Sequence, residues 1–273
     1  HPKVAATVER AVALWRQREK VLVFCHYVAT GKSLRQWISD AIQNEIVQMG
    51  SQKLKCDPAD VLERLDLLGK RFFDTDSPIR QACDRAVSAL LESYPTLADS
   101  REKLQNIVRR NVRTPTFLVR YFPLEEEHLT AESMSRALDT PDQSGMTLRV
   151  LLHNFFHFLV EHCSQKDRQE YLESLESIQT GVYLGRFSSE FVSPGDEDME
   201  GAERLVPNVR LVNGRTRPDL RRRLMLTFNT PFYPDVLIAS SVMAEGVDLH
   251  LNCRYIIHHD LCWNPSTLEQ RTG

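Results

Sequence analysis

The sequence predicts an α/β fold in which a parallel sheet flanked by helices is interrupted by a mainly α-helical insertion domain. Two short apolar runs near the carboxyl end, Val236–Ala239 and Tyr255–Ile257, each lead directly into a polar loop. Runs of this kind are typical of parallel strands that are buried on both faces of a sheet. A third run, Lys20–Cys25, lies near the amino end, and the long stretch between it and the other two has helical periodicity.

The elements of the predicted sheet domain follow in order. An amphipathic helix over about residues 3–17 precedes the strand Lys20–Cys25, and another helix begins near Gly31. The next strand would follow after a short loop in an uninterrupted domain, but it is predicted only at Val209–Val212. Apolar residues at helical spacing define the helix that begins near Gly31: Leu34, Trp37, Ile38 and Ile42.

The intervening stretch carries repeated helix-start signals. Asp57 and Ser77 each stand directly before a proline, the arrangement expected of an N-cap followed by proline at the first helical position. Further segments with helical periodicity begin near Arg101, Met146 and Asp167. The stretch therefore predicts a domain built from several helices.

Two domains follow from this pattern. Residues 1–45 and 206–273 form the predicted sheet domain, and residues 46–205 form the helical insertion. An acidic segment at about 193–203 lacks an apolar period, which predicts a linker.

Composition narrows the class of protein. The net charge of −3 provides no global attraction to nucleic acid, so such binding must depend on local patches. The six cysteines form no Cys-x-x-Cys pair, which argues against a zinc ribbon or a secreted disulfide framework. No run approaches the roughly twenty apolar residues of a membrane span, so we expect no membrane partner and a cytoplasmic protein.

Polar residues are concentrated after the last two predicted strands. Ser240, Ser241, Glu245, Gly246 and Asp248 follow the first of these strands. His258, His259, Asp260 and Asn264 follow the second. The carboxyl ends of parallel strands are where α/β proteins bind ligands, so we expect the functional site there.

These residues resemble the second motor lobe of superfamily 2 helicases and translocases, and most closely the Swi/Snf-like branch of bacterial type. The segment from Ser241 to Asp248 resembles motif V, and Gln270–Gly273 resembles the opening of motif VI. Glu19–Tyr27 is similar to motif IV. Gly214, Arg221 and Phe228 repeat a family spacing of seven residues, with Thr216 beside the glycine.

The resemblance implies a RecA-like lobe of the P-loop NTPase type and a role for each matching residue. Glu245, Gly246 and Asp248 would make ATP-coupled contacts, and Gln270 would open the catalytic motif VI. The arginine fingers of that motif would lie beyond Gly273, so we expect the chain to be a fragment. Residues implied in nucleic-acid contact are Ser241, Ser240, Tyr27, Gly214, Thr216 and Arg221.

ATP and Mg²⁺ would be bound mainly by a first lobe that this chain lacks. The tetrapeptide Thr30–Ser33 ends like a P-loop, but His26 occupies the position where that loop requires a glycine. Without a P-loop and arginine fingers, the chain alone is expected to be inactive as an ATPase. The alternative interpretation of residues 241–248 is a polar turn between a strand and a helix.

Two histidine pairs suggest metal sites that the sequence does not complete. His153 and His157 stand four residues apart, as in zinc proteases, but Asn154 replaces the glutamate that would act as general base. His258 and His259 are neighbours at a strand end and should point to opposite faces of the sheet. We predict no metal site.

One basic stretch within the insertion leaves two interpretations open. Arg109, Arg110 and Arg113 lie among further basic residues and near the aromatic residue Phe117, which suits contact with a phosphate backbone. The same residues could instead form a solvated helix face paired with the acidic run Glu125–Glu127.

The sequence therefore predicts the second motor lobe of an ATP-dependent DNA helicase or translocase. Its expected partners are double- or single-stranded DNA, the first helicase lobe and a protein bound through the helical insertion. The alternative is a non-catalytic interaction module in which the insertion recruits a protein partner.

Overall fold

The computed structural model describes residues 2–126, 128–142, 144–177, 208–240 and 251–260. The chain divides into two compact units. One unit comprises His1–Gln43 and Gly185–Gly273, and the other comprises Asn44–Leu184. We call them the sheet unit and the helical unit. That the helical unit is an insertion within a helicase lobe stays a prediction.

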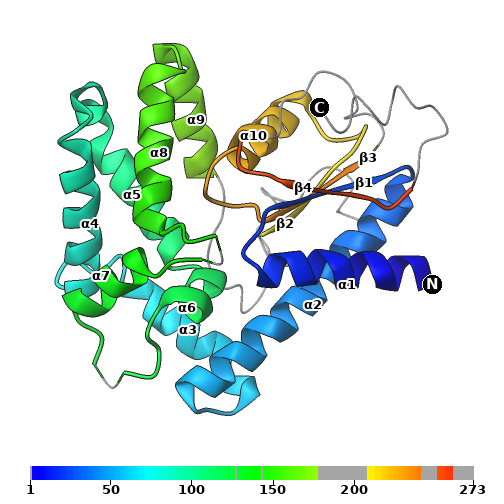
Figure 1. Cartoon of the computed structure of the whole chain (residues 1–273), viewed down its shortest axis with the longest axis horizontal. Coiled ribbons are helices and arrows are strands. Elements are labelled where there is room, and N and C mark those ends of the chain that lie inside the picture. Colours follow the sequence, from blue (N-terminus) through cyan, green and yellow to red (C-terminus); the bar gives the residue numbers. More distant parts are fainter. Residues whose placement is uncertain (1, 127, 143, 178–207, 241–250, 261–273) are drawn as a thin grey trace. The chain divides into compact units, whose positions relative to one another are not determined.

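The sheet unit contains four strands in the described residues: β1 (Val21–Cys25), β2 (Val209–Val212), β3 (Val236–Ser240) and β4 (Tyr255–His258). Their order is β2-β3-β1-β4, and every pair is parallel (Figure 1). Val21 lies opposite both Val236 and Tyr255, and Cys25 lies opposite Ser240. The prediction of a parallel sheet flanked by helices is confirmed.

Burial differs between the central strands and β4. All residues of β1 and β3 are buried, as expected for parallel strands covered on both faces. Every residue of β4 is only partly buried, and β1 is its neighbour in the described sheet. The sheet therefore holds β4 from one side.

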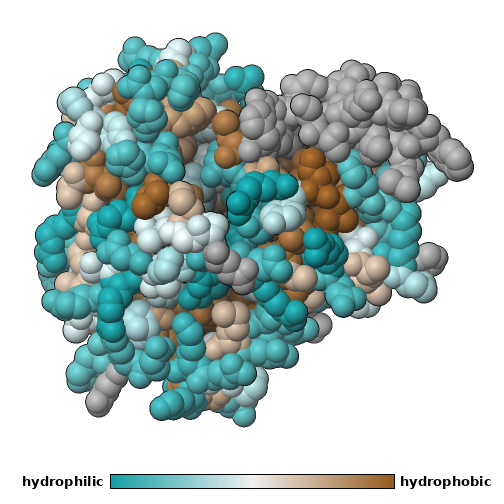
Figure 2. All heavy atoms as spheres, viewed as in Figure 1, coloured by the Kyte–Doolittle hydropathy of each residue, from teal (hydrophilic) through white to brown (hydrophobic). Residues whose placement is uncertain are grey.

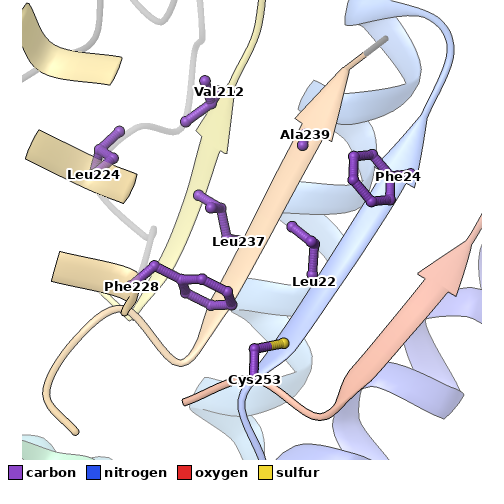
Figure 3. Close-up of a cluster of buried hydrophobic side chains, with 8 residues drawn as sticks. All are labelled: Leu22, Phe24, Val212, Leu224, Phe228, Leu237, Ala239 and Cys253. Carbon is purple, nitrogen blue, oxygen red and sulfur yellow. The ribbon is translucent and has the colours of Figure 1, made fainter. Parts of the chain in front are cut away.

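Helix α10 (Pro218–Phe228) covers one face of this sheet. Its residues Leu224 and Phe228 pack with Leu22 of β1 and Leu237 of β3, as Figure 3 shows. This cluster also contains side chains from β2 and from the residues before β4, so apolar burial ties together segments far apart in sequence.

Helix α2 (Val28–Leu54) approaches the opposite face at Gly31. A Cβ atom at Gly31 would lie 2.9 Å from Leu211 Cδ1 and 3.2 Å from Cys25 Sγ. The absence of a side chain thus lets the helix backbone lie close to the strands. Helix α1 (Pro2–Arg16) contacts β1 and β4, and Trp15 Nε1 of α1 donates to Asp235 Oδ2 at 3.0 Å.

Every described element of the helical unit is a helix. The unit also includes the carboxyl-terminal turns of α2. At Gly50 of α2 a Cβ would lie 2.4 Å from Val61 Cγ1, so this helix also packs closely there. The elements are η1 (Pro58–Asp60), α3 (Val61–Lys70), α4 (Pro78–Leu91), η2 (Pro95–Ser100), α5 (Arg101–Val112), α6 (Pro115–Tyr121), α7 (Ala131–Asp139), α8 (Leu148–Glu161) and α9 (Gln165–Ser177).

The sequence signals for helix starts agree with the structure in part. The Asp57 side chain accepts a hydrogen bond from Ala59 N at 2.9 Å, so it caps η1 as predicted. Ser77 precedes α4 but makes no capping hydrogen bond. Helices α6 and α7 were not predicted, although Thr130 forms a capping box with Ser133 at the start of α7.

Hydrophilic residues cover much of the face drawn in Figure 2, with smaller hydrophobic areas between them. Among the residues described, no helix combines the length and the apolar character needed to cross a bilayer.

Candidate functional site

The carboxyl ends of the four parallel strands place polar residues along one edge of the sheet. Following the strand order, the residues at or just beyond these ends are Asn213, Ser240, His26 and His259. We call this edge, with the residues that directly follow the strands, the polar edge. It is the position at which open α/β sheets bind ligands.

Tyr27 presents an accessible aromatic ring at the polar edge. Its side chain is 66% exposed, and its ring lies edge-on to His26 with centroids 4.8 Å apart. Gly31 N donates to the Tyr27 carbonyl at 3.0 Å, which places residues Thr30–Ser33 within helix α2. That this segment forms no phosphate-binding loop stays a prediction, which rests on His26 at the position where such a loop requires a glycine.

In the loop after β2, Gly214 and Thr216 differ in exposure to solvent. Thr216 is buried, and its hydroxyl accepts a hydrogen bond from Asn213 N at 3.0 Å. Thr216 N donates back to the Asn213 carbonyl at 3.0 Å, so this residue closes the turn. Gly214 and Arg215 are exposed. A nucleic acid could therefore reach the tip of the loop more readily than the Thr216 hydroxyl.

Helix α10 begins directly after this loop and carries a group of arginines. Arg221 is partly buried and donates from Nη2 to the Thr216 carbonyl at 3.4 Å. Arg217 pairs with Asp219 at 2.9 Å, and both side chains are about half exposed or more. The exposed arginines of this region are Arg215, Arg217, Arg222 and Arg223. We call these accessible arginines the basic surface of α10; Arg215 and Arg217 lie in the segment that joins β2 to α10, at the polar edge.

Ser240 lies inside β3 and not in the loop beyond it. The residue is 2% exposed, and its hydroxyl oxygen has no hydrogen-bond partner among the described residues. Burial makes contact with nucleic acid unfavourable for Ser240, and that contact stays a prediction.

The two neighbouring histidines at the end of β4 point to opposite faces of the sheet. The ring of His258 stacks on Phe24, with centroids 5.8 Å apart. The Nδ1 atom of His259 instead lies 2.8 Å from Thr7 Oγ1 of helix α1. The prediction that these side chains separate is confirmed, and its cause is the alternation of side chains along a strand.

The basic stretch of the helical unit is used mainly within that unit. Arg109 is buried and pairs with Asp84 of α4, with Nη1 and Oδ2 2.7 Å apart. Arg110 donates from Nη1 to the carbonyl oxygen of Glu176, and the Arg113 guanidinium lies 5.1 Å from the ring centroid of Phe73. The partners of these arginines come from other helices and loops of the unit.

One residue of the acidic run, Glu126, makes contacts outside the basic stretch. Glu126 accepts a hydrogen bond from Ser133 Oγ at 2.7 Å and pairs with Arg136. The interpretation in which the acidic run neutralises the basic stretch is therefore not what the described ion pairs show. Nucleic-acid contact by Arg109, Arg110 and Arg113 stays a prediction, and burial makes it least favourable for Arg109.

Several predicted site residues lie outside the described part of the chain. They are Ser241, Glu245, Gly246, Asp248 and Gln270. Within the described residues, no group of three or more His, Cys, Asp and Glu side chains is arranged to hold a metal ion. In particular, His153 approaches the Tyr94 hydroxyl, with Nε2 and Oη 3.1 Å apart.

The carboxyl-terminal part of the chain matches a known family model. Residues 192–273 are similar to the helicase conserved C-terminal domain. The matched segment includes β2, α10, β3 and β4 and hence most of the residues predicted at the polar edge. Comparison of the chain with curated proteins and with solved structures gave no match.

The sequence did not indicate two residues that contact the polar edge. Lys3 and Thr7 of α1 reach Asp260 and His259, respectively. Their partners lie more than two hundred positions away in sequence, so no local pattern could have paired them. The one available signal is that Lys3 and Thr7 stand four residues apart and share a helix face.

Proposed function

We propose that this chain is the second motor lobe of an ATP-dependent DNA helicase or translocase of superfamily 2, of the Swi/Snf-like bacterial type. The observation that carries the proposal is the match of residues 192–273 to the helicase C-terminal domain. The parallel sheet supports it, because the polar residues of the matched segment follow strand ends at one edge.

In this proposal the residues after β3 couple ATP to DNA. Glu245, Gly246 and Asp248 contact the nucleotide side, and Ser241 contacts a phosphate of the nucleic acid. Gln270 opens motif VI. The first lobe of a longer protein would supply most of the contacts to ATP and Mg²⁺, so this chain alone would not hydrolyse ATP.

The basic surface of α10 is our candidate for DNA contact in the sheet unit. Its exposed arginines neighbour Gly214, whereas the basic residues of α5 are largely engaged inside the helical unit. A phosphate backbone requires accessible cations, so exposure favours the α10 region.

A direct test is ATP hydrolysis by the two-lobe protein with and without double- and single-stranded DNA. DNA-stimulated turnover that disappears in Asp248→Ala would support the motor and place Asp248 in its coupling. Glu9→Ala is a suitable control, because it removes an exposed carboxylate of the same unit. Absence of turnover with any nucleic acid would contradict the proposal.

DNA binding offers a second test that does not depend on hydrolysis. Replacing Arg215 and Arg223 by alanine should weaken binding and reduce the salt dependence of log Kd by about 0.9 for each DNA phosphate that is no longer neutralised. The matched control replaces the exposed Arg64 and Arg101 of the helical unit, which removes the same charge. Equal effects of both double variants would argue against the α10 surface.

The second candidate function is a non-catalytic interaction module. It is favoured by two observations: Arg109 of the helical unit pairs with Asp84 inside that unit, and the unit exposes apolar side chains such as Leu67 and Val150. In this case the helical unit would recruit a protein partner. A two-lobe protein without ATP turnover that still binds a partner through residues 44–184 would support it.

A further inference from the structure

Two polar contacts join the first turns of α1 to the carboxyl end of β4. Lys3 Nζ donates to Asp260 Oδ1 at 2.5 Å, and Thr7 Oγ1 lies 2.8 Å from His259 Nδ1. Lys3 and Thr7 are on the same face of the helix, and their partners are consecutive in sequence. We call these four residues the α1–β4 clamp.

The inner contact of the clamp is buried. Thr7 is 7% exposed and His259 is 6% exposed. Removing either partner would leave a buried polar atom without its hydrogen bond, which costs more than an exposed contact contributes. Burial also lowers the pKa of His259, although Asp260 acts to raise it, so the contact is between neutral groups at neutral pH.

The outer contact is a salt bridge connected to β1. Asp260 Oδ2 accepts from His26 N at 2.9 Å, and His259 N donates to the Phe24 carbonyl at 2.8 Å. Partial burial acts to raise the pKa of Asp260, but the hydrogen bonds from Lys3 and His26 N hold it below its usual range. The carboxylate is therefore charged and oriented at neutral pH.

The clamp acts on the least buried strand of the described sheet. Strand β4 is partly buried throughout, and within the described sheet it pairs with β1 on one side. Helix α1 therefore supplies a second attachment at the carboxyl end of this strand. Residues 261–273 continue the chain from Asp260, and they include Gln270.

We infer that Lys3 and Thr7 are positioning residues, which fix the carboxyl end of β4, from which the chain continues to Gln270. The inference rests on the proposed function, in which Gln270 belongs to the ATP-coupling motif VI. Among the described residues, the side-chain hydrogen bonds of Lys3 and Thr7 are those to Asp260 and His259. They act by holding His259 and Asp260 against α1 and β1.

The opposite end of β4 provides a matched control. Arg254, directly before β4, pairs with Glu19, which lies between α1 and β1. This salt bridge also fastens β4 but adjoins the amino ends of the strands. Its removal should leave the polar edge unchanged.

Amide hydrogen exchange of this 273-residue chain tests the clamp itself. In Thr7→Val and in Lys3→Met, the amides of His26 and His259 should exchange about tenfold faster, which corresponds to a loss of about 1.4 kcal/mol. The exchange rates of the Val23 and Ile238 amides should not change in these two variants. In Arg254→Met, none of the four amides should exchange faster. Thr7→Ser should restore slow exchange. Unchanged exchange at His26 and His259, or equal acceleration across the sheet, would overturn the inference.

ATP hydrolysis by the two-lobe protein tests the positioning role. Thr7→Val should lower kcat at least several-fold with little change in KM for ATP, and Thr7→Ser should restore kcat. Arg254→Met should retain normal kcat. Looser amides combined with an unchanged kcat would show that the clamp is structural and would overturn the positioning role. If the unsubstituted protein hydrolyses no ATP, the proposed function fails and the positioning role fails with it, whereas the exchange result still decides whether the clamp holds β4.

Discussion

The interiors of the two units accommodate a buried cation in different ways. In the helical unit, Arg109 is paired with the carboxylate of Asp84 at 2.7 Å. In the sheet unit, Lys20 donates to the Phe228 carbonyl at 2.9 Å and lies 5.1 Å from the centroid of the Phe228 ring. An arginine keeps its charge when buried and requires a counter-charge, whereas a buried lysine can lose its proton.

The pKa of Lys20 shows that this buried lysine can lose its proton near neutral pH. Burial lowers the pKa from 10.5 to about 7, although Asp235 acts to raise it. At neutral pH this side chain is therefore close to half-protonated, and a backbone carbonyl suffices as its partner. The partner that a buried cationic side chain requires therefore depends on whether that side chain can lose its proton.

The largest effect is expected from breaking the charged pair in the helical unit. Arg109→Leu should lower the free energy of unfolding by about 3 kcal/mol, the low end for a buried pair, because Asp84 is partly exposed and still pairs with Arg80 at 3.6 Å. Urea unfolding measures this change. Arg64→Leu is the control, since Arg64 is exposed. A loss below about 1 kcal/mol would mean that the pair behaves like a surface salt bridge.

A smaller effect is expected from two glycines of helix α2, one packed in each unit. Gly50→Ala should destabilise the protein by about 1 to 3 kcal/mol, since its Cβ would lie 2.4 Å from Val61 Cγ1. Gly31→Ala, with a nearest contact of 2.9 Å to Leu211 Cδ1, should cost less. Hydrogen exchange should accelerate in α3 for the first variant and in β1 and β3 for the second. If each variant accelerated hydrogen exchange both in α3 and in the strands, the interiors of the two units would not respond independently.

The smallest and most gradual effect is the pH dependence due to Lys20. Between pH 7 and 10.5 the unfolded state keeps the proton that the folded state has lost, so the free energy of unfolding rises with pH. The contribution of Lys20 should approach about 1.4 kcal/mol per pH unit. Urea unfolding from pH 7 to about 8 measures it, because this range lies below the pKa of about 8.5 at which cysteines of the unfolded chain lose their protons.

Lys20→Met should remove this contribution, because the variant has no proton to release. Lys166→Met should keep it, since Lys166 is exposed. A slope that is the same in the unsubstituted protein and in Lys20→Met would show that Lys20 stays protonated when folded.

Local patterns in the sequence determined much of the fold. The apolar runs at Lys20–Cys25 and Val236–Ala239 predicted the parallel strands β1 and β3, because a strand buried on both faces needs no polar residues. Asp57 predicted a cap because its side chain needs only the next backbone N–H groups. The opposite directions of His258 and His259 followed from the alternation of a strand.

Other properties depended on contacts between distant segments. The sequence could not distinguish the buried Arg109 from the exposed Arg223, because charge runs look alike until helices pack around them. The predicted strand ended at Ala239, because the polar side chain of Ser240 suggested a loop. In the structure, β3 includes Ser240. The prediction also missed α7, whose capping residues Thr130 and Ser133 were hidden in a polar stretch.

The sequence by itself determined the class of fold and the similarity of residues 192–273 to a helicase C-terminal domain, since both depend on short, ordered patterns. Only the tertiary structure decided which cations are accessible and that Lys3 and Thr7 meet Asp260 and His259. The physical reason is that periodicity and capping act over a few residues, whereas burial and long-range hydrogen bonds exist only after packing brings distant segments together.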